Sequence, residues 1–387
     1  MPWWNKMKLR YSNGIVGSDH TKDNVRWLYY STYKKDGDYY VEDKMANETA
    51  RWETAHKRDL GIEMGWFKSA LTLDIDLFDE YRKDMLLTPV ITPLVAVDYK
   101  DINIGEMKKH GFEAEIKYRR TTPGGLYYEF GGMAGFNENR ITKYSDDPSK
   151  VKYQWWEGTS FGAQMDGLNQ ADSGFFTSID DLHSYPNPYA TWNLTYPGIY
   201  KYSDYNADGY IDSDDYHPIE GMKYPDLTYS FNAKLGYKGW TFSILFYGNA
   251  GKYSSFMGPY DTEFADGDLL VHKSQLDYWT PTNSNASVHR IPSFISQFTT
   301  LKEDGVFEGH SWRRSDFLNL KEAYLAYRFD GDKLKSKFGI DGLTLTLTGN
   351  NLLTFTGLVE GDPQIKNLNN SYYPLVSIVK FGVKLDF

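Results

Sequence analysis

Hydrophobic and polar residues alternate with a period of two along many separate stretches of the chain, which is the pattern of β-strands with two different faces. In the stretch 377–387, one face would carry Val379, Phe381, Val383, Leu385 and Phe387. A typical strand of a soluble protein has about 5–6 residues, whereas a tilted strand that crosses a bilayer needs about 9–11. This stretch therefore fits a membrane barrel strand, with the last strand of a soluble sheet as the alternative.

The same alternation predicts ten strands, and the connections between them are sorted by length. The predicted strands are 6–16, 56–66, 70–81, 110–120, 125–136, 227–237, 240–249, 317–329, 342–353 and 377–387. Long and short connections alternate from the first to the last, as they do in outer-membrane barrels. We therefore expect the long loops, including 137–226 and 251–315, to be extracellular, and the turn 330–341 and Phe387 to be periplasmic.

Composition narrows the class of protein. The chain has 387 residues with 17% aromatic side chains, and no run of 18 apolar residues that would form a transmembrane helix. A net charge of −10 argues against a nucleic-acid partner, since phosphate backbones bind basic surfaces. The absence of cysteine excludes disulfides and thiolate chemistry. The start, MPWWNKMKLR, lacks the pattern of a signal peptide, so we expect the chain to be part of a longer protein or to begin elsewhere in its mature form.

Six stretches of the chain carry a resemblance to one family, at 51–87, 101–119, 200–215, 315–329, 345–357 and 377–387. Together, and in this order, they resemble the SusC-like (SusC/RagA-type) TonB-dependent transporters of Bacteroidetes. RWETAHKRDLGIEMGWFKSALTLDIDLFDEYRKDMLL at 51–87 resembles a segment and hairpin of that family, and DINIGEMKKHGFEAEIKYR at 101–119 resembles its next strand. YKYSDYNADGYIDSDD at 200–215 resembles the family's D-x-N-G-D-G-x-I loop, with Ala207 where glycine is usual. The strands SDFLNLKEAYLAYRF and LTLTGNNLLTFTG and the last strand resemble the end of the barrel.

The resemblance implies an all-β fold, an antiparallel transmembrane β-barrel segment made of about ten C-terminal strands of a barrel with about 22 strands. Residues 1–387 would be the C-terminal portion of the barrel, without the plug domain, TonB box and signal peptide. The family imports glycans or peptides across the outer membrane. Its partners would be the N-terminal half of the barrel and plug, a SusD-like surface lipoprotein, the TonB complex and outer-membrane lipids.

The acidic stretch DYNADGYIDSDD at 204–215 has the spacing of a calcium-binding loop. Calcium prefers oxygen ligands at positions 1, 3, 5, 7, 9 and 12 of such a loop, with glycine at position 6. Here these ligand positions hold Asp204, Asn206, Asp208, Tyr210 through its carbonyl, Asp212 and Asp215, and Gly209 holds position 6. Position 12 is Asp215 rather than the longer glutamate, which weakens the pattern. The alternative is an acidic turn that folds on its own hydrogen bonds.

The long loops contain aromatic residues that could stack on sugar rings of a ligand. The candidates are Trp155, Trp156, Tyr189, Trp192, Trp279 and Trp312. Their alternative role is packing, because large loops need apolar cores of their own. The sequence does not decide between glycan and peptide ligands.

No catalytic motif is present, so we do not expect an enzyme. The eight histidines are scattered without metal-ligand spacing, and G-x-S-x-G is absent. Two further functions stay open beside that of a transporter part. One is a surface glycan-binding module without transport, and the other is a passive porin.

Overall fold

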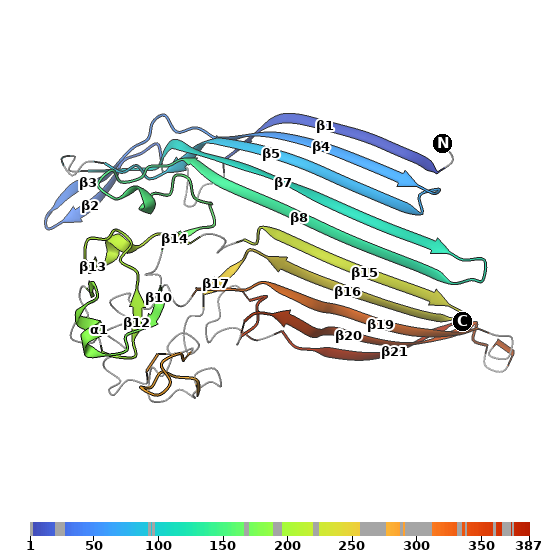
Figure 1. Cartoon of the computed structure of the whole chain (residues 1–387). Coiled ribbons are helices and arrows are strands. Elements are labelled where there is room, and N and C mark those ends of the chain that lie inside the picture. The colour runs from blue at the N-terminus through green and yellow to red at the C-terminus, as the bar shows by residue number, and fades with distance from the viewer. Residues whose placement is uncertain are drawn as a thin grey trace.

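The computed structural model describes residues 3–387 except 20–27, 92–93, 95–96, 166–169, 189–195, 220–223, 256–275, 287–288, 291–311, 331–334, 337–338, 359–360, 366–372 and 374. The fold is all-β and centres on one antiparallel sheet of ten long strands. Figure 1 shows these strands running side by side, with the N- and C-termini at one end and the loops at the other. Across the described residues, no helix has the length and apolar character needed to cross a membrane.

The strands of the large sheet follow one another in chain order. They are β1 (Trp4–Ser18), β4 (Glu53–Trp66), β5 (Leu71–Leu87), β7 (Ile102–Thr121), β8 (Tyr127–Lys143), β15 (Leu227–Tyr237), β16 (Trp240–Ala250), β19 (Phe317–Asp330), β20 (Gly342–Thr356) and β21 (Ile378–Asp386). The ten predicted strands and the fold class are thus confirmed. The prediction for 110–120 was too short, because β7 begins at Ile102 and its polar first half continues the ladder with β5.

The small elements lie in the long connections. A three-stranded sheet joins β2 (Thr32–Asp36), β3 (Tyr39–Met45) and β6 (Asp98–Tyr99). The remaining pairs are formed by β9 (Gln164–Met165), β10 (Gln170–Phe175), β11 (Asn187–Pro188), β12 (Tyr200–Tyr202), β13 (Tyr210–Ile211), β14 (Pro218–Ile219), β17 (Tyr253–Ser255) and β18 (Trp312–Arg314). One short helix, α1 (Ile179–His183), and two 3-10 turns, Lys152–Gln154 and Ser213–Asp215, complete the described elements.

Register gives the large sheet one apolar and one polar face, because directly paired residues of neighbouring strands point the same way. One apolar row runs through Met7, Met64, Leu73 and Ile116. The row beside it on the polar face runs through Lys8, Glu63, Asp74 and Glu115. On the other half of the sheet, the apolar face continues through Leu235, Phe242, Leu325, Leu347 and Phe381.

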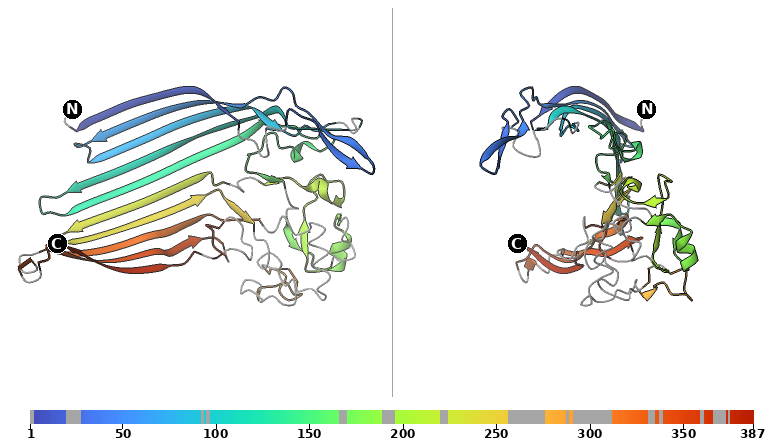
Figure 2. Two further views of the ribbon diagram at one scale, coloured as in Figure 1. Left: turned by 180° about the vertical axis from the view of Figure 1, so that it is seen from behind. Right: turned by 90° about the vertical axis from the view of Figure 1, so that its left-hand side faces the viewer.

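The sheet is curved and remains open, as the two views of Figure 2 show. β1 and β21 are its edges, and each has only one hydrogen-bonded neighbour among the described strands. Phe381, close to the middle of β21, has 70% of its surface exposed, and Leu9 of β1 has 63%. Apolar side chains on both edge strands therefore lack cover within the described chain.

Tight turns hold the hairpins at the end of the sheet where both termini lie. Lys238 and Gly239 connect β15 to β16 with positive φ angles of 44° and 85°, the conformation of the favoured two-residue hairpin turn. Between β4 and β5, Ser69 also has a positive φ, of 61°. Asn5 of β1 stabilises this second turn, since its Oδ1 accepts from the Ser69 N–H at 3.1 Å and its Nδ2 donates to the Ser69 Oγ at 2.9 Å.

We expect Gly239→Ala to destabilise the β15–β16 hairpin by about 1–2 kcal/mol, the cost of a left-handed backbone for an L-residue. The added Cβ would also lie 2.7 Å from the Arg328 carbonyl oxygen. Gly14→Ala is the matched control, because a Cβ at Gly14 meets no heavy atom within 4 Å. Amide hydrogen exchange of β15 and β16 in the complete receptor measures the effect. Equal exchange in both variants would contradict this prediction.

Candidate functional site

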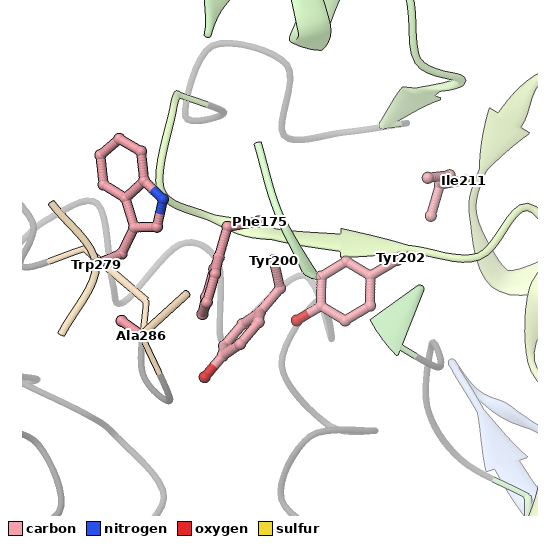
Figure 3. Packing of buried hydrophobic residues seen from close by; sticks show 6 residues of the cluster. All are labelled: Phe175, Tyr200, Tyr202, Ile211, Trp279 and Ala286. Atoms are coloured by element: carbon pink, nitrogen blue, oxygen red, sulfur yellow. The ribbon is translucent and has the colours of Figure 1, made fainter. Parts of the chain in front are cut away.

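The loops beyond the sheet contain a hydrophobic core of their own, assembled from segments far apart in the sequence. Figure 3 shows how its side chains converge. The core, which we call the loop core, consists of Phe175, Tyr200, Tyr202, Ile211, Trp279 and Ala286. Tyr200 is 1% exposed, and its ring stacks on Phe175 with centroids 4.9 Å apart. The loop core therefore fixes the shape of the loop end of the sheet.

A partly buried ion pair lies beside the loop core. The Lys201 Nζ donates to the Asp181 Oδ1 at 2.7 Å, and it lies 5.5 Å from the ring centroid of Phe176 and 5.4 Å from that of Tyr185. Burial raises the pKa of the Asp181 carboxyl, but hydrogen bonds from Lys201 and Thr177 outweigh it and hold that pKa below its ordinary value. The pair thus connects α1 to β12 at the edge of the loop core.

The acidic stretch 204–215 forms a tight turn in which carboxylates accept backbone hydrogen bonds. Asp204 accepts from the N–H groups of Asp208 and Gly209 at 3.2 and 2.9 Å, and Asp208 accepts from the Tyr210 N–H at 2.8 Å. Asn206 accepts from the Asp208 N–H at 2.9 Å. Gly209 has a φ of 89° with open space around it, so backbone conformation is the reason for glycine at this position.

Asp215 is the structural centre of this turn, with 1% of its surface exposed. Its carboxylate accepts from the backbone N–H groups of Tyr205 at 2.7 Å, Asn206 at 3.3 Å and Asp212 at 2.9 Å. Burial raises the pKa of the Asp215 carboxyl above its ordinary value, while these three hydrogen bonds act to lower it. The Asp212 side chain in turn accepts from the Asp214 N–H at 2.8 Å, which caps the 3-10 turn.

The turn is also anchored to the loop that follows β8. Gln154 donates from Nε2 to the Ser213 carbonyl at 2.7 Å, and the Tyr153 hydroxyl donates to the Asp214 carbonyl. The rings of Tyr153 and Tyr205 meet edge to face at 4.7 Å. These contacts hold the acidic turn in one orientation.

The predicted metal ligands therefore lie on one turn, and their oxygens accept backbone hydrogen bonds. Among the residues that the structure describes, no group of three or more histidine, aspartate or glutamate side chains is arranged to hold a metal ion. This geometry agrees with the self-bonded turn that the sequence left as the alternative. Calcium binding stays a prediction.

The predicted aromatic residues fall into three groups. Trp155 and Trp156 are half-buried in the loop after β8, where Lys152 lies over the Trp155 ring and Tyr144 contacts the Trp156 ring. Trp279 is 3% exposed and packs in the loop core, which favours the packing role at that position. Trp312 begins β18, but its side chain lies outside the described part of the structure, as do Tyr189 and Trp192 altogether.

The polar face of the sheet contains a feature that was not predicted as a site. A hollow of about 460 Å³ is lined by acidic residues of β5 and β7 and by small or aromatic residues of β8, β15 and β16. Asp74 and Glu115 are direct cross-strand partners in it, as are Asp76 and Glu113. The sequence signal for this hollow is the alternation of acidic and apolar residues in 71–77 and 112–116. Only the register of β5 with β7 shows that the acidic residues of the two strands are adjacent.

Comparison with known proteins finds relatives along nearly the whole chain. No family model matches the sequence. The chain is 25% identical to TonB-dependent receptor P3 of Formosa agariphila and 23% identical to TonB-dependent receptor SusC of Bacteroides thetaiotaomicron, with 98% of the chain covered in both. A solved structure of the RagAB peptide importer matches the whole chain with a TM-score of 0.71 at 20% identity.

The chain spans 39% of the P3 receptor, 37% of SusC and 41% of the matched RagAB chain. The chain is thus similar to part of the length of TonB-dependent receptors, SusC among them, and its ten-stranded sheet matches the fold of part of the RagAB structure. Both relatives are named as receptors and not as enzymes.

We expect Asp181→Asn to destabilise the loop core by about 2 kcal/mol, because a charge-assisted hydrogen bond is lost and Lys201 stays buried. The lowered pKa of Asp181 means that the ion pair stabilises the fold above the ordinary carboxyl pKa of 3.8 and that this contribution is lost as the pH falls through the lowered value. Hydrogen exchange of the β12 amides at pH 7 measures the loss. Asp180→Asn, at an exposed neighbour, is the control and should leave exchange unchanged.

Proposed function

We propose that the chain forms the C-terminal part of the barrel wall of an active outer-membrane importer. The observation that carries this proposal is the open antiparallel sheet with one apolar face and two edges that have no further strand in the described chain. TonB-dependent receptors are outer-membrane barrels, and a strand row such as Leu235, Phe242, Leu325, Leu347 and Phe381 suits contact with lipid.

The edges require further strands if the sheet lies in a membrane. In the hydrocarbon core, an unpaired backbone N–H or C=O costs several kcal/mol, because no water is present to bond it. β1 has 15 residues and β21 has nine, so each edge would expose many such groups. We propose that the N-terminal part of the receptor pairs with both edges and brings the plug and the TonB box, with about twelve more strands if the barrel has 22.

The proposed orientation of the sheet in the membrane follows from the alternation of long and short connections between its strands. The turns at Lys238–Gly239 and at 67–70 are short, so we propose that they are periplasmic, together with Phe387. The long loops, with the loop core and the acidic turn, would then be extracellular. A SusD-like lipoprotein would bind at this loop end, and TonB would couple energy through the N-terminal part.

The imported substrate would be a glycan or a peptide. The matched RagAB protein is a peptide importer, and the half-buried Trp155 and Trp156 suit either class. A passive porin and a glycan-binding module without transport are the competing functions. Deletion of TonB separates them, because only an active importer loses uptake of its substrate in the deletion strain. Uptake that is independent of TonB would favour the porin.

We expect Leu347→Arg to reduce assembly of the receptor in the outer membrane, since a charge on the lipid face costs about 2–4 kcal/mol near the bilayer centre. Thr346→Arg, one residue earlier and on the polar face, is the matched control and should assemble normally. Heat-modifiable migration of the receptor in isolated outer membranes measures assembly. The membrane-facing assignment would be wrong if the two variants assembled equally.

We also propose that the acidic turn binds calcium in the assembled receptor. The ligand order of Asp204, Asn206, Asp208 and Asp212 supports this, together with the left-handed Gly209. Calcium, but not magnesium, should then slow amide exchange in 204–215, with oxygen ligands at about 2.3–2.6 Å. Asp208→Asn should weaken the effect. If calcium does not change amide exchange in 204–215, the self-bonded turn explains the acidic sequence instead.

A further inference from the structure

Arg120 is a charged side chain on the apolar face of the large sheet. It is the penultimate residue of β7, at the end of the sheet where both termini lie (Figure 1). Its direct cross-strand partner is Tyr128 of β8, which pairs in turn with Leu235 of β15. Leu235 pairs with Phe242. Arg120 therefore belongs to an apolar row and points to the side of the sheet that we propose contacts lipid.

The apolar face around Arg120 contains no acidic side chain. Its neighbours on that face, on its own strand and on the strands beside it, are Leu71, Ile116, Tyr118, Tyr128, Phe130 and Leu235. Arg119 differs, because it points to the polar face and has Glu129 as its direct cross-strand partner. Arg120 is exposed, and an exposed guanidinium without a carboxylate beside it is suited to an anionic ligand.

The position of Arg120 along β7 coincides with the boundary of the apolar band. On this face of the strand, His110 and Arg120 enclose the apolar positions 112, 114, 116 and 118. The ten residues from His110 to Arg120 span about 33 Å of strand. A strand tilt of about 35–45° reduces this length to about 25 Å across the membrane, which equals the height of the apolar band in transmembrane barrels. Arg120 would therefore lie at the level of the lipid headgroups.

Two tyrosines flank Arg120 and supply further hydrogen-bond donors. The rings of Tyr118 and Tyr128 are tilted against each other with centroids 5.8 Å apart, and the Arg120 guanidinium is close enough to interact with both hydroxyl groups. The turn between the two strands is closed by reciprocal bonds. The Thr122 N–H donates to the Leu126 carbonyl at 2.8 Å, and the Leu126 N–H donates to the Thr122 Oγ1 at 3.1 Å. The hairpin thus holds the three donor side chains together.

We propose that Arg120, Tyr118 and Tyr128 bind the phosphate group of a phospholipid in the periplasmic leaflet. A guanidinium matches phosphate through two parallel N–H···O bonds, and each phenol hydroxyl can donate to another phosphate oxygen. The acyl chains would lie over Ile116 and Phe130, which are 50% and 42% exposed further into the apolar band. The proposal rests on the proposed barrel function and orientation, and it adds a defined lipid site to them.

The test uses the complete receptor in detergent, and native mass spectrometry measures the dissociation constant of the first dioleoylphosphatidylglycerol bound. Arg120→Gln should weaken this binding about tenfold, as expected for loss of a hydrogen bond between charged groups. Arg119→Gln is the matched control, because its side chain lies on the polar face and should leave binding unchanged. Heat-modifiable migration in isolated outer membranes checks that both variants assemble.

Two further arms separate the phosphate from the acyl chains. Tyr118→Phe combined with Tyr128→Phe keeps both rings and removes the hydroxyl groups, so it should weaken binding of phosphatidylglycerol about fivefold. Dioleoylglycerol has the same acyl chains without the phosphate, and it should bind the unaltered receptor at least tenfold more weakly than phosphatidylglycerol. Because this last arm uses the unaltered protein, it does not depend on whether a variant folds.

Three results would overturn the phospholipid site: equal binding of phosphatidylglycerol by Arg120→Gln and Arg119→Gln, equal binding of dioleoylglycerol and phosphatidylglycerol, or tighter binding of lipopolysaccharide than of phosphatidylglycerol. TonB-dependent uptake distinguishes this failure from failure of the import function. Uptake that persists while Arg120→Gln binds phosphatidylglycerol like the unaltered receptor would refute the lipid site and leave the import function standing.

Discussion

The cross-strand hydrogen-bond ladder is the interaction on which the rest of this structure depends. Each inner strand of the ten-stranded sheet has a hydrogen-bonded neighbour on both sides, and among the described strands of this sheet only β1 and β21 do not. The two open edges matter for the whole protein, because an apolar sheet face with unpaired edge strands is not stable in water or in lipid. In the proposed membrane barrel, further strands would have to pair with these two edges, because the unpaired groups belong to the backbone and not to particular side chains.

The register of that ladder converts a simple sequence pattern into two surfaces with different chemistry. A shift of one residue would exchange the faces of a strand, yet apolar rows stay continuous from β1 to β7 and from β15 to β21. On the polar face, the Arg10 Nη2 donates to the Asp76 Oδ1 at 2.9 Å across two strands, so part of the acidic wall is neutralised by β1. Asp74 and Glu115 stand directly opposite each other, and the Lys117 Nζ lies 2.9 Å from the Glu115 Oε1, so Glu115 is ion-paired within its own strand.

The loop end of the sheet is stabilised by other interactions. Its stability comes from a small core of aromatic rings and from turns that satisfy their own backbone, rather than from a ladder. Asp215 shows the principle, since one buried carboxylate orders three N–H groups of the turn around it. Beyond Asn137, whose N–H donates to the Asp226 carbonyl at 2.9 Å, β8 bonds through Ile141 to the loop residues Gly158 and Thr159 instead of to β15, and the regular ladder gives way to this loop architecture.

The sequence by itself determined the ten strands, their order and the sorting of long and short connections, because period-two alternation and turn residues such as Lys238–Gly239 are local signals. It also located the acidic turn, whose hydrogen bonds are local. Only the tertiary structure decided that Trp279 packs inside the loop core, that Lys201 pairs with Asp181, and that Asp74 meets Glu115. These contacts join residues of different segments. Their proximity depends on strand register or on loop packing, and neither can be read from the residues of one segment alone.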